Sequence, residues 1–349
     1  MMGQHATPGV KTRIWTPVDF TADGKQSDCL RLPHSTDLSA YGWIPIPVVC
    51  IKNGPGPTAL LVAGNHGDEY EGQIALSNLA REIRADQISG RLIIIPALNY
   101  PAVEAGQRVS PLDDGNLNRM FPGDPLGSPT QMIADYVCQE LIPMADLVVD
   151  LHSGGRSLDY VASALVRPGR DAVEHERLIH LLRVFGAPIS FISDGTGGGG
   201  MTTLAAAAEA KGALVLTTEL GGGATLSLDG LSLAASGLRR LLKDLRIMSD
   251  IDVETASPTR LMTVSGHDAF VYADERGVFE PAAEVGEEVA KGQIACRIHF
   301  PDLPTREPQT LLFGSSGLVA CRRVPSLTRR GDCLFKLMRD LAPGRAGHG

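Results

Sequence analysis

The chain has 349 residues, of which 43% are hydrophobic and 21% charged, a composition typical of a globular protein with a sizeable apolar core. Its 32 basic and 40 acidic side chains give a net charge of −8, which argues against nucleic acid or an anionic membrane as a partner and favours a small molecule. No apolar stretch approaches the roughly 18 residues of a spanning helix, and the N-terminal stretch lacks the apolar core of a signal peptide. We therefore expect a cytoplasmic protein.

Six cysteines are scattered without any CxxC pair, mostly in apolar runs. This distribution favours reduced thiols in a core over a disulfide framework or a cysteine zinc site.

Over the first two thirds of the chain, short apolar runs alternate with longer amphipathic segments, a pattern that predicts an α/β sheet flanked by helices. The expected strands are, in chain order, 44–51, 58–64, 91–98, 146–152, 189–193 and 213–219. The expected helices are 71–84, 129–142, 171–185, 202–211 and 229–246. Together these elements predict one catalytic α/β domain over 1–250.

The remaining sequence reads as short strand-like pieces, such as GVFEP and QIACRIHF, separated by glycine, proline and charge. This change of pattern predicts a small all-β domain over 251–349, joined through the polar stretch DIDVETASPT. The final stretch, APGRAGHG, is expected to be disordered.

The stretch VAGNHGDEYEGQIAL, residues 62–76, places His66 and Glu69 directly after a predicted buried strand. On a tight turn or the first turn of a helix both side chains can face one point, so they are candidate metal ligands. The alternative is that Asp68, Glu69 and Glu71 only mark a helix start, where acidic side chains meet the positive end of the helix dipole.

A third candidate ligand, His152, ends another predicted strand in VVDLHSGG. Ligands gather at the carboxyl ends of strands in open α/β sheets, and two histidines with one carboxylate are the protein ligands of a catalytic zinc. Glu219, in LVLTTELGGG, ends a further predicted strand, where a carboxylate can take a proton from the water that the metal activates. A structural zinc site would instead be closed by four protein ligands and would not need Glu219.

The polar segment GQRVSPLDDGNLNRMFPG follows the strand predicted at 91–98 and contains Arg108, Asn116, Asn118 and Arg119. Loops of this kind on a rigid scaffold often carry function. An arginine can bind a carboxylate or stabilise an oxyanion, whereas the alternative is an ordinary solvated charge.

In their order along the chain, the motifs GNHGDE, NLNR, DLHSGG and TELGG resemble the succinylglutamate desuccinylase and aspartoacylase family, relatives of the zinc carboxypeptidases. The resemblance covers 58–225 by motif, and the β-rich end is similar to the small C-terminal domain of that family. It implies a zinc carboxypeptidase-like mixed sheet flanked by helices, plus that small β domain. It further implies one Zn²⁺ per chain.

The same resemblance implies a role for each motif. Zn²⁺ would be held by His66, Glu69 and His152, with Glu219 as the general base. Arg108 would polarise the scissile carbonyl, and the carboxylate of the substrate would be bound by Asn118 and Arg119.

Within the family, GNHGDEYEGQIAL and TTELGGGAT are most similar to members that hydrolyse the linear amide of an N-acetylated amino acid and release acetate and 2,4-diaminobutyrate, a step of ectoine breakdown. The alternative is a desuccinylase or aspartoacylase-type deacylase of another N-acyl amino acid. An amine on the substrate needs a carboxylate partner, and four aspartates are left as unranked candidates: Asp68, Asp113, Asp114 and Asp159.

Two further classes are less favoured. The glycines 195, 197 and 200 satisfy GxGxxG between a predicted strand and helix, as in a dinucleotide-binding unit, but a run of four glycines meets this pattern easily, and we favour a mobile loop. A serine hydrolase is disfavoured because LHSGG and FGSSGL lack the GxSxG elbow. The oligomeric state is left open, with a homo-oligomer among the alternatives.

Overall fold

The computed structural model describes residues 10–193, 195, 200–264 and 266–341. The chain divides into two compact units. The first comprises Met1–His152, Gly199–Thr217 and Leu238–Glu254, and the second comprises Ser153–Gly198, Thr218–Gly237 and Thr255–Gly349. The chain therefore leaves each unit and returns to it twice.

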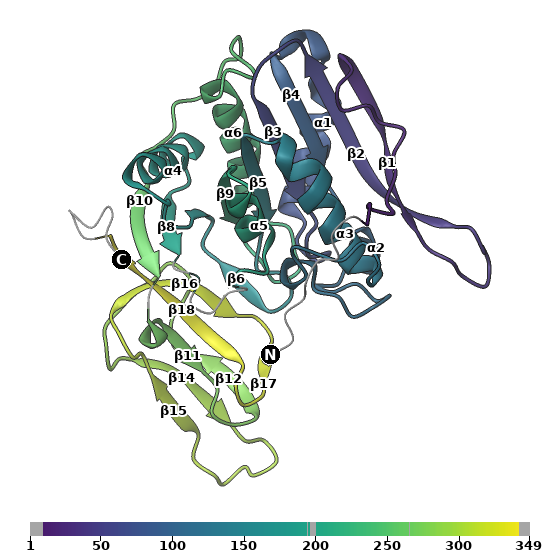
Figure 1. The fold of residues 1–349 in the computed structure, drawn as a ribbon. Coiled ribbons are helices and arrows are strands. Elements are labelled where there is room, and N and C mark those ends of the chain that lie inside the picture. Colours follow the sequence, from purple (N-terminus) through teal and green to yellow (C-terminus); the bar gives the residue numbers. More distant parts are fainter. Residues whose placement is uncertain (1–9, 194, 196–199, 265, 342–349) are drawn as a thin grey trace. The chain divides into compact units, whose positions relative to one another are not determined.

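The first unit is built on a mixed sheet with the strand order β1-β2-β4-β3-β5-β9 (Figure 1). The strands are β1 (Gly24–Pro33), β2 (Trp43–Asn53), β3 (Thr58–Ala63), β4 (Gly90–Ile95), β5 (Leu147–His152) and β9 (Leu214–Glu219), which belongs to this unit up to Thr217. β2 is antiparallel to β1 and β4, whereas β3 is parallel to β4 and β5. The carboxyl ends of β3 and β5 therefore lie at the same edge of the sheet.

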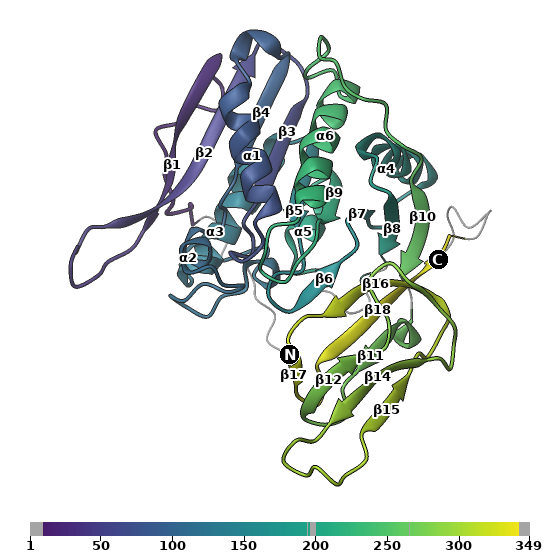
Figure 2. The ribbon, with the colours of Figure 1, turned by 180° about the vertical axis from the view of Figure 1, so that it is seen from behind.

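Helices cover both faces of this sheet, with α1 and α3 on opposite faces (Figures 1 and 2). The α-helices of this unit are α1 (Glu71–Glu82), α2 (Tyr100–Ala105), α3 (Pro129–Tyr136) and α5 (Leu204–Ala210). A further helix, α6 (Leu228–Asp244), belongs to the second unit up to Gly237 and to the first from Leu238. Because both faces of the sheet are covered, every residue of β3 is buried.

The second unit contains one row of parallel strands. β7 (Ser163–Val166) and β8 (Ile189–Ser193) are parallel neighbours joined by α4 (Ala172–Phe185), and β10 (Arg260–Val264) continues the parallel row beside β8. α4 begins at an aspartate cap, since the Asp171 side chain accepts a hydrogen bond from the Glu174 backbone N–H.

The rest of the second unit is antiparallel. Its strands are β6 (Leu158–Tyr160), β11 (Phe270–Tyr272), β12 (Gly277–Pro281), β13 (Glu288–Val289), β14 (Ile294–His299), β15 (Gln309–Leu312), β16 (Gly317–Arg323), β17 (Leu327–Thr328) and β18 (Cys333–Asp340). One row runs β10-β18-β16-β13, and a separate four-stranded sheet runs β15-β14-β12-β17. The edge-to-face rings of Phe279, Phe313 and Phe335 lie in the core of this part.

The predicted fold class, a mixed α/β sheet flanked by helices with a C-terminal all-β part, is confirmed. The domain boundary predicted at 250 stays a prediction. The second compact unit takes in 153–198 and 218–237 as well as the chain from Thr255 onward. Within the first two thirds of the chain, the strands β1, β6 and β7 and the helix α2 are additional to the predicted elements. The helix predicted over 129–142 is α-helical only to Tyr136, after which a π-helical turn occupies Val137–Leu141.

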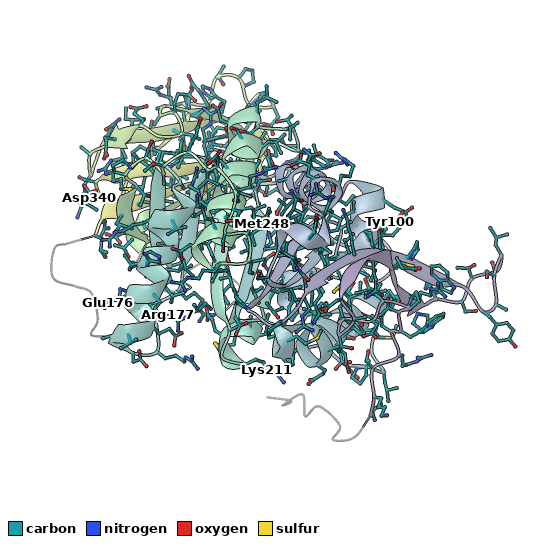
Figure 3. The ribbon with its side chains drawn as sticks, turned by 90° about the horizontal axis from the view of Figure 1, so that it is seen from above. Tyr100, Glu176, Arg177, Lys211, Met248 and Asp340 are labelled. Atoms are coloured by element: carbon teal, nitrogen blue, oxygen red, sulfur yellow. The ribbon has the colours of Figure 1, made fainter. Side chains whose placement is uncertain are left out.

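One prediction about α4 is wrong. We expect from the sequence that both histidines of this charged helix are solvated, but His175 is 7% exposed and only His180 is exposed. The exposed face of α4 is occupied by Glu176 and Arg177, which directly follow His175 (Figure 3).

Among the described residues, no helix is long and apolar enough to span a bilayer.

Candidate metal centre

His66 and Glu69 lie on the turn that connects β3 to α1. They therefore precede the helix, which begins at Glu71. The turn passes so close to α2 that a Cβ atom on Gly67 would lie 1.9 Å from the carbonyl oxygen of Ala102, so only glycine fits there. The backbone N–H of Gly67 donates to the carbonyl of Gln107 at 2.8 Å, which fastens the turn to the loop after α2.

His152 is the last residue of β5, and the parallel pairing of β3 with β5 brings it to the same edge as the turn. Its Nδ1 atom lies 2.8 Å from Oε2 of Glu69, and Nδ1 of His66 lies 2.6 Å from Oε1 of the same carboxylate. All three side chains are buried, and their ligand atoms lie within 4.8 Å of one another. The three sequence-predicted ligands are thus brought together around one point.

Burial and charge act in opposite directions in this cluster. Burial alone would raise the pKa of the Glu69 carboxyl, but the neighbouring histidines hold it well below its usual range. Burial would likewise lower the pKa of His152, but the carboxylates of Asp150 and Glu69 raise it well above its usual value. For His66 burial prevails and lowers the pKa, although Glu69 opposes it. An ionised carboxylate with two imidazoles is a donor set that suits zinc.

Each histidine has a further partner on its second ring nitrogen. Nε2 of His152 lies 3.0 Å from Oδ2 of Asp150, which also accepts a hydrogen bond from the side chain of Asn65. Nε2 of His66 lies 3.2 Å from Oδ1 of Asn116. Asp150 and Asn65 are both about as buried as the ligands themselves.

Sequence reasoning assigns none of these three partners to a histidine ring, although it places Asn116 in the polar loop that is expected to carry function. The available signals are weak: Asp150 precedes His152 by two positions on a strand, so both side chains lie on one face, and Asn65 is adjacent to His66 in GNHGDE. The sequence alone does not indicate which of the many polar residues meets which ring.

The loop after α2 places Arg108 and Asn118 at the cluster. Nη1 of Arg108 lies 3.3 Å from Nδ1 of His66 and 3.4 Å from Oε1 of Glu69, and 41% of the arginine side chain is exposed. Nδ2 of Asn118 lies 3.1 Å from Nε2 of His152, while its Oδ1 accepts the backbone N–H of Leu204 at the start of α5.

Arg119, next in sequence, is exposed and donates through Nη1 to the carbonyl oxygen of Asn118 at 2.7 Å. Its guanidinium is therefore held near Asn118 while remaining accessible. An accessible arginine beside an amide donor can bind a carboxylate.

Glu219 is the last residue of β9, the sheet neighbour of β5, and is half-buried. It belongs to the second unit. In that unit, burial raises the pKa of Tyr160 on β6 well above its usual range, and the nearby Cys321 and Glu219 act in the same direction. The Glu219 carboxylate therefore acts electrostatically on Tyr160.

The four candidate aspartates differ in their surroundings. Asp113 accepts hydrogen bonds from the backbone and hydroxyl of Thr130, which holds the loop to α3. Asp68 is buried on the ligand turn, Asp114 is exposed with a φ of 51°, and Asp159 is on β6 in the second unit. The carboxylate of Asp113 is thus used to hold the loop in place.

Of the three glycines in the GxGxxG pattern, Gly197 lies outside the described residues.

The fold and the cluster together define an α/β protein with a buried group of three side chains, two histidines and one glutamate, that could hold a metal ion at the carboxyl ends of neighbouring strands. The chain belongs to the succinylglutamate desuccinylase/aspartoacylase family: residues 55–245 match the catalytic domain of that family.

Among curated proteins, the chain is 39% identical over 321 residues to the N-alpha-acetyl-L-2,4-diaminobutyric acid deacetylase of Halomonas elongata, covering 92% of this chain and 93% of the relative. Among solved structures, it is similar to the product-bound ectoine utilization protein EutE of Ruegeria pomeroyi, with 41% identity and a TM-score of 0.90. It is equally similar in fold to a succinylglutamate desuccinylase/aspartoacylase from Rhodobacter sphaeroides, with 38% identity and a TM-score of 0.90. Each match covers 95% of this chain and 100% of the solved one.

Proposed function

We propose that the chain is a zinc-dependent hydrolase that cleaves the amide bond of an N-acyl amino acid. The observation that carries this proposal is the buried cluster of His66, Glu69 and His152, whose ligand atoms lie within 4.8 Å of one another. Such a set of two imidazoles and one carboxylate leaves a coordination position open for chemistry. Zinc bound there would supply a Lewis acid that activates water and polarises a carbonyl at neutral pH.

The substrate that we propose is N-alpha-acetyl-L-2,4-diaminobutyrate, hydrolysed to acetate and 2,4-diaminobutyrate. Support comes from the names of two relatives, a deacetylase of this compound at 39% identity and an ectoine utilization protein at 41% identity. The alternative is a desuccinylase or aspartoacylase-type deacylase, which is how the similar structure from Rhodobacter sphaeroides is described.

Arg108 is proposed to stabilise the developing oxyanion. Its guanidinium lies within 3.4 Å of His66 and Glu69 and remains 41% exposed, so it can turn toward a bound acyl group beside the cluster. Once aimed at the carbonyl oxygen, the guanidinium would stabilise the negative charge that appears on that oxygen in the transition state.

The substrate carboxylate is proposed to bind Asn118 and Arg119, which are linked by a hydrogen bond from the arginine. Holding the carboxylate there would fix the acyl group relative to the cluster and reduce the entropic cost of attack.

Glu219 is proposed to act as the general base and then as the general acid. It would take a proton from the attacking water and return it to the amine as the carbon–nitrogen bond breaks. Glu219 ends β9 and lies within the residues that match the catalytic domain of the family, which supports this role.

The test is a side-by-side assay of the zinc-loaded protein with N-alpha- and N-gamma-acetyl-diaminobutyrate, N-acetylaspartate and N-succinylglutamate. We expect the highest kcat/KM for the N-alpha-acetyl isomer. Activity confined to the last two compounds would overturn the substrate assignment and leave the hydrolase assignment in place.

A metal-removal arm tests the hydrolase assignment itself. Dialysis against dipicolinate is expected to abolish turnover, and added zinc is expected to restore it. Full turnover by protein shown to contain no metal would contradict the proposal.

A further inference from the structure

Asn116 has no role in the mechanism above, yet it contacts one of the proposed metal ligands. Its Oδ1 atom lies 3.2 Å from Nε2 of His66. The other ring nitrogen of His66, Nδ1, lies 2.6 Å from Glu69. The two ring nitrogens of His66 therefore face two different partners on opposite sides of the ring.

A side-chain amide oxygen can only accept a hydrogen bond. When Nε2 of His66 bonds to Oδ1 of Asn116, the neutral ring must carry its proton on Nε2. Without a metal, the Glu69 carboxylate 2.6 Å away competes for this proton on Nδ1; with a cation bound to the cluster, the lone pair of Nδ1 would be free to bind it while Asn116 holds the proton on Nε2. The contact with Asn116 thus selects the tautomer in which His66 can bind a metal.

The same contact connects two parts of the chain. Asn116 immediately precedes the short helix Leu117–Arg119, which carries Asn118 and Arg119, whereas His66 lies on the turn after β3. The side chain of Asn118 in turn approaches His152 to 3.1 Å. Residues two apart in one loop therefore each contact a different histidine of the cluster.

We propose that Asn116 is a positioning residue that fixes the tautomer and the orientation of His66 and so ties the loop of residues 106–119 to the metal ligands. This inference rests on the proposed metal site. Outer partners of metal-binding histidines typically contribute about 10- to 100-fold to metal affinity. His152 has a buried carboxylate in this position, and Asn116 supplies the corresponding acceptor to His66 as a neutral amide.

The first test measures zinc affinity by competition with a fluorescent chelator at constant pH. Asn116→Leu removes the acceptor at similar volume, Asn116→Asp keeps a side-chain oxygen, and Gln107→Ala changes an exposed residue of the same loop. We expect the leucine variant to bind zinc about 10- to 100-fold more weakly and the other two to stay within about threefold of the wild type. Wild-type affinity in the leucine variant would overturn the proposal.

The second test does not depend on any variant folding. Nitrogen-15 spectra of the zinc-loaded wild-type protein report which ring nitrogen of each histidine carries a proton and which one binds the metal. We expect His66 to be protonated on Nε2, and a proton found on Nδ1 would overturn the proposal. Both tests are read without substrate, so a protein that passes them but cleaves none of the acyl compounds would refute the proposed function alone.

Discussion

Nε2 of His152 lies 3.0 Å from Oδ2 of Asp150, while Nδ1 of the same ring lies 2.8 Å from Oε2 of Glu69. A carboxylate on each side leaves the imidazole no freedom to rotate or exchange tautomers, because Asp150 accepts the proton on Nε2. Asp150 is itself held by Asn65, so the orientation of His152 is determined by residues of β5 and of the turn after β3.

Removing the charge of Asp150 should weaken metal binding without unfolding the protein. Asp150→Asn keeps the shape of the side chain but makes a poorer acceptor, so zinc affinity is expected to fall about 10- to 100-fold. Competition with a chelator gives the affinity, and Asp114→Asn is the matched control because Asp114 is exposed and asparagine tolerates its φ of 51°. Equal affinity in both variants would show that Asp150 has no influence on the metal.

Zinc binding should release a proton near neutral pH. Because Asp150 and Glu69 overcome the effect of burial and raise the pKa of His152 well above its usual value, the ring is protonated at pH 7 in the metal-free protein. A ligand nitrogen must lose its proton, so affinity falls as the pH is lowered through that raised pKa. Calorimetric titration with zinc in buffers of different ionisation enthalpy counts the protons released; none released would contradict the raised pKa.

Glu219→Gln should separate metal binding from turnover. Loss of a general base typically costs about 10²- to 10⁴-fold in rate, whereas Glu219 is not one of the three clustered ligands. We expect stoichiometric zinc with kcat lowered by roughly that factor. The measurements are metal analysis and steady-state kinetics on the same preparation, and unchanged kcat would eliminate Glu219 as the base.

Gly67→Ala should damage the fold and the metal centre together. The added Cβ would lie 1.9 Å from the carbonyl oxygen of Ala102, so the turn that carries His66 and Glu69 must shift. We expect a loss of about 1–3 kcal/mol in the free energy of unfolding, together with weaker zinc binding. Thermal unfolding measures the first effect, and Glu104→Ala, an exposed change on α2, provides the baseline.

Much of the fold is predictable because the strands that carry the site are continuous apolar runs. β3 and β5 are buried at every position, and such runs stand out in a sequence. β1 is harder to detect because it lies at the end of the sheet order and its first five residues are half-buried or exposed polar and glycine residues. The early end of the helix after Pro129 also has no sequence signal, since Val137–Leu141 would suit an α-helix equally well.

The candidate ligands are predictable for a different reason. His66, Glu69 and His152 lie in compact motifs at strand ends, and parallel strands bring those ends together whatever the details of packing. The residues that contact the second ring nitrogen of each histidine depend instead on the exact register of the strands and the course of the loops. Asp150 meets Asn65 only because β3 and β5 pair with Val62 opposite Asp150, and a shift of one residue would turn Asp150 to the other face.

The side chain of Asn118 makes two contacts at once, and one of them is a hydrogen bond that its Oδ1 accepts from the backbone N–H of Leu204. It caps the backbone at the start of α5 with its oxygen, and it points its nitrogen toward His152. Truncating Asn118 therefore frees the end of a helix as well as deleting a donor, and the resulting kinetic change mixes both losses. Asn118→Asp keeps the capping oxygen but replaces the amide donor with a negatively charged oxygen, so this variant tests the recognition of a carboxylate while the start of α5 stays capped.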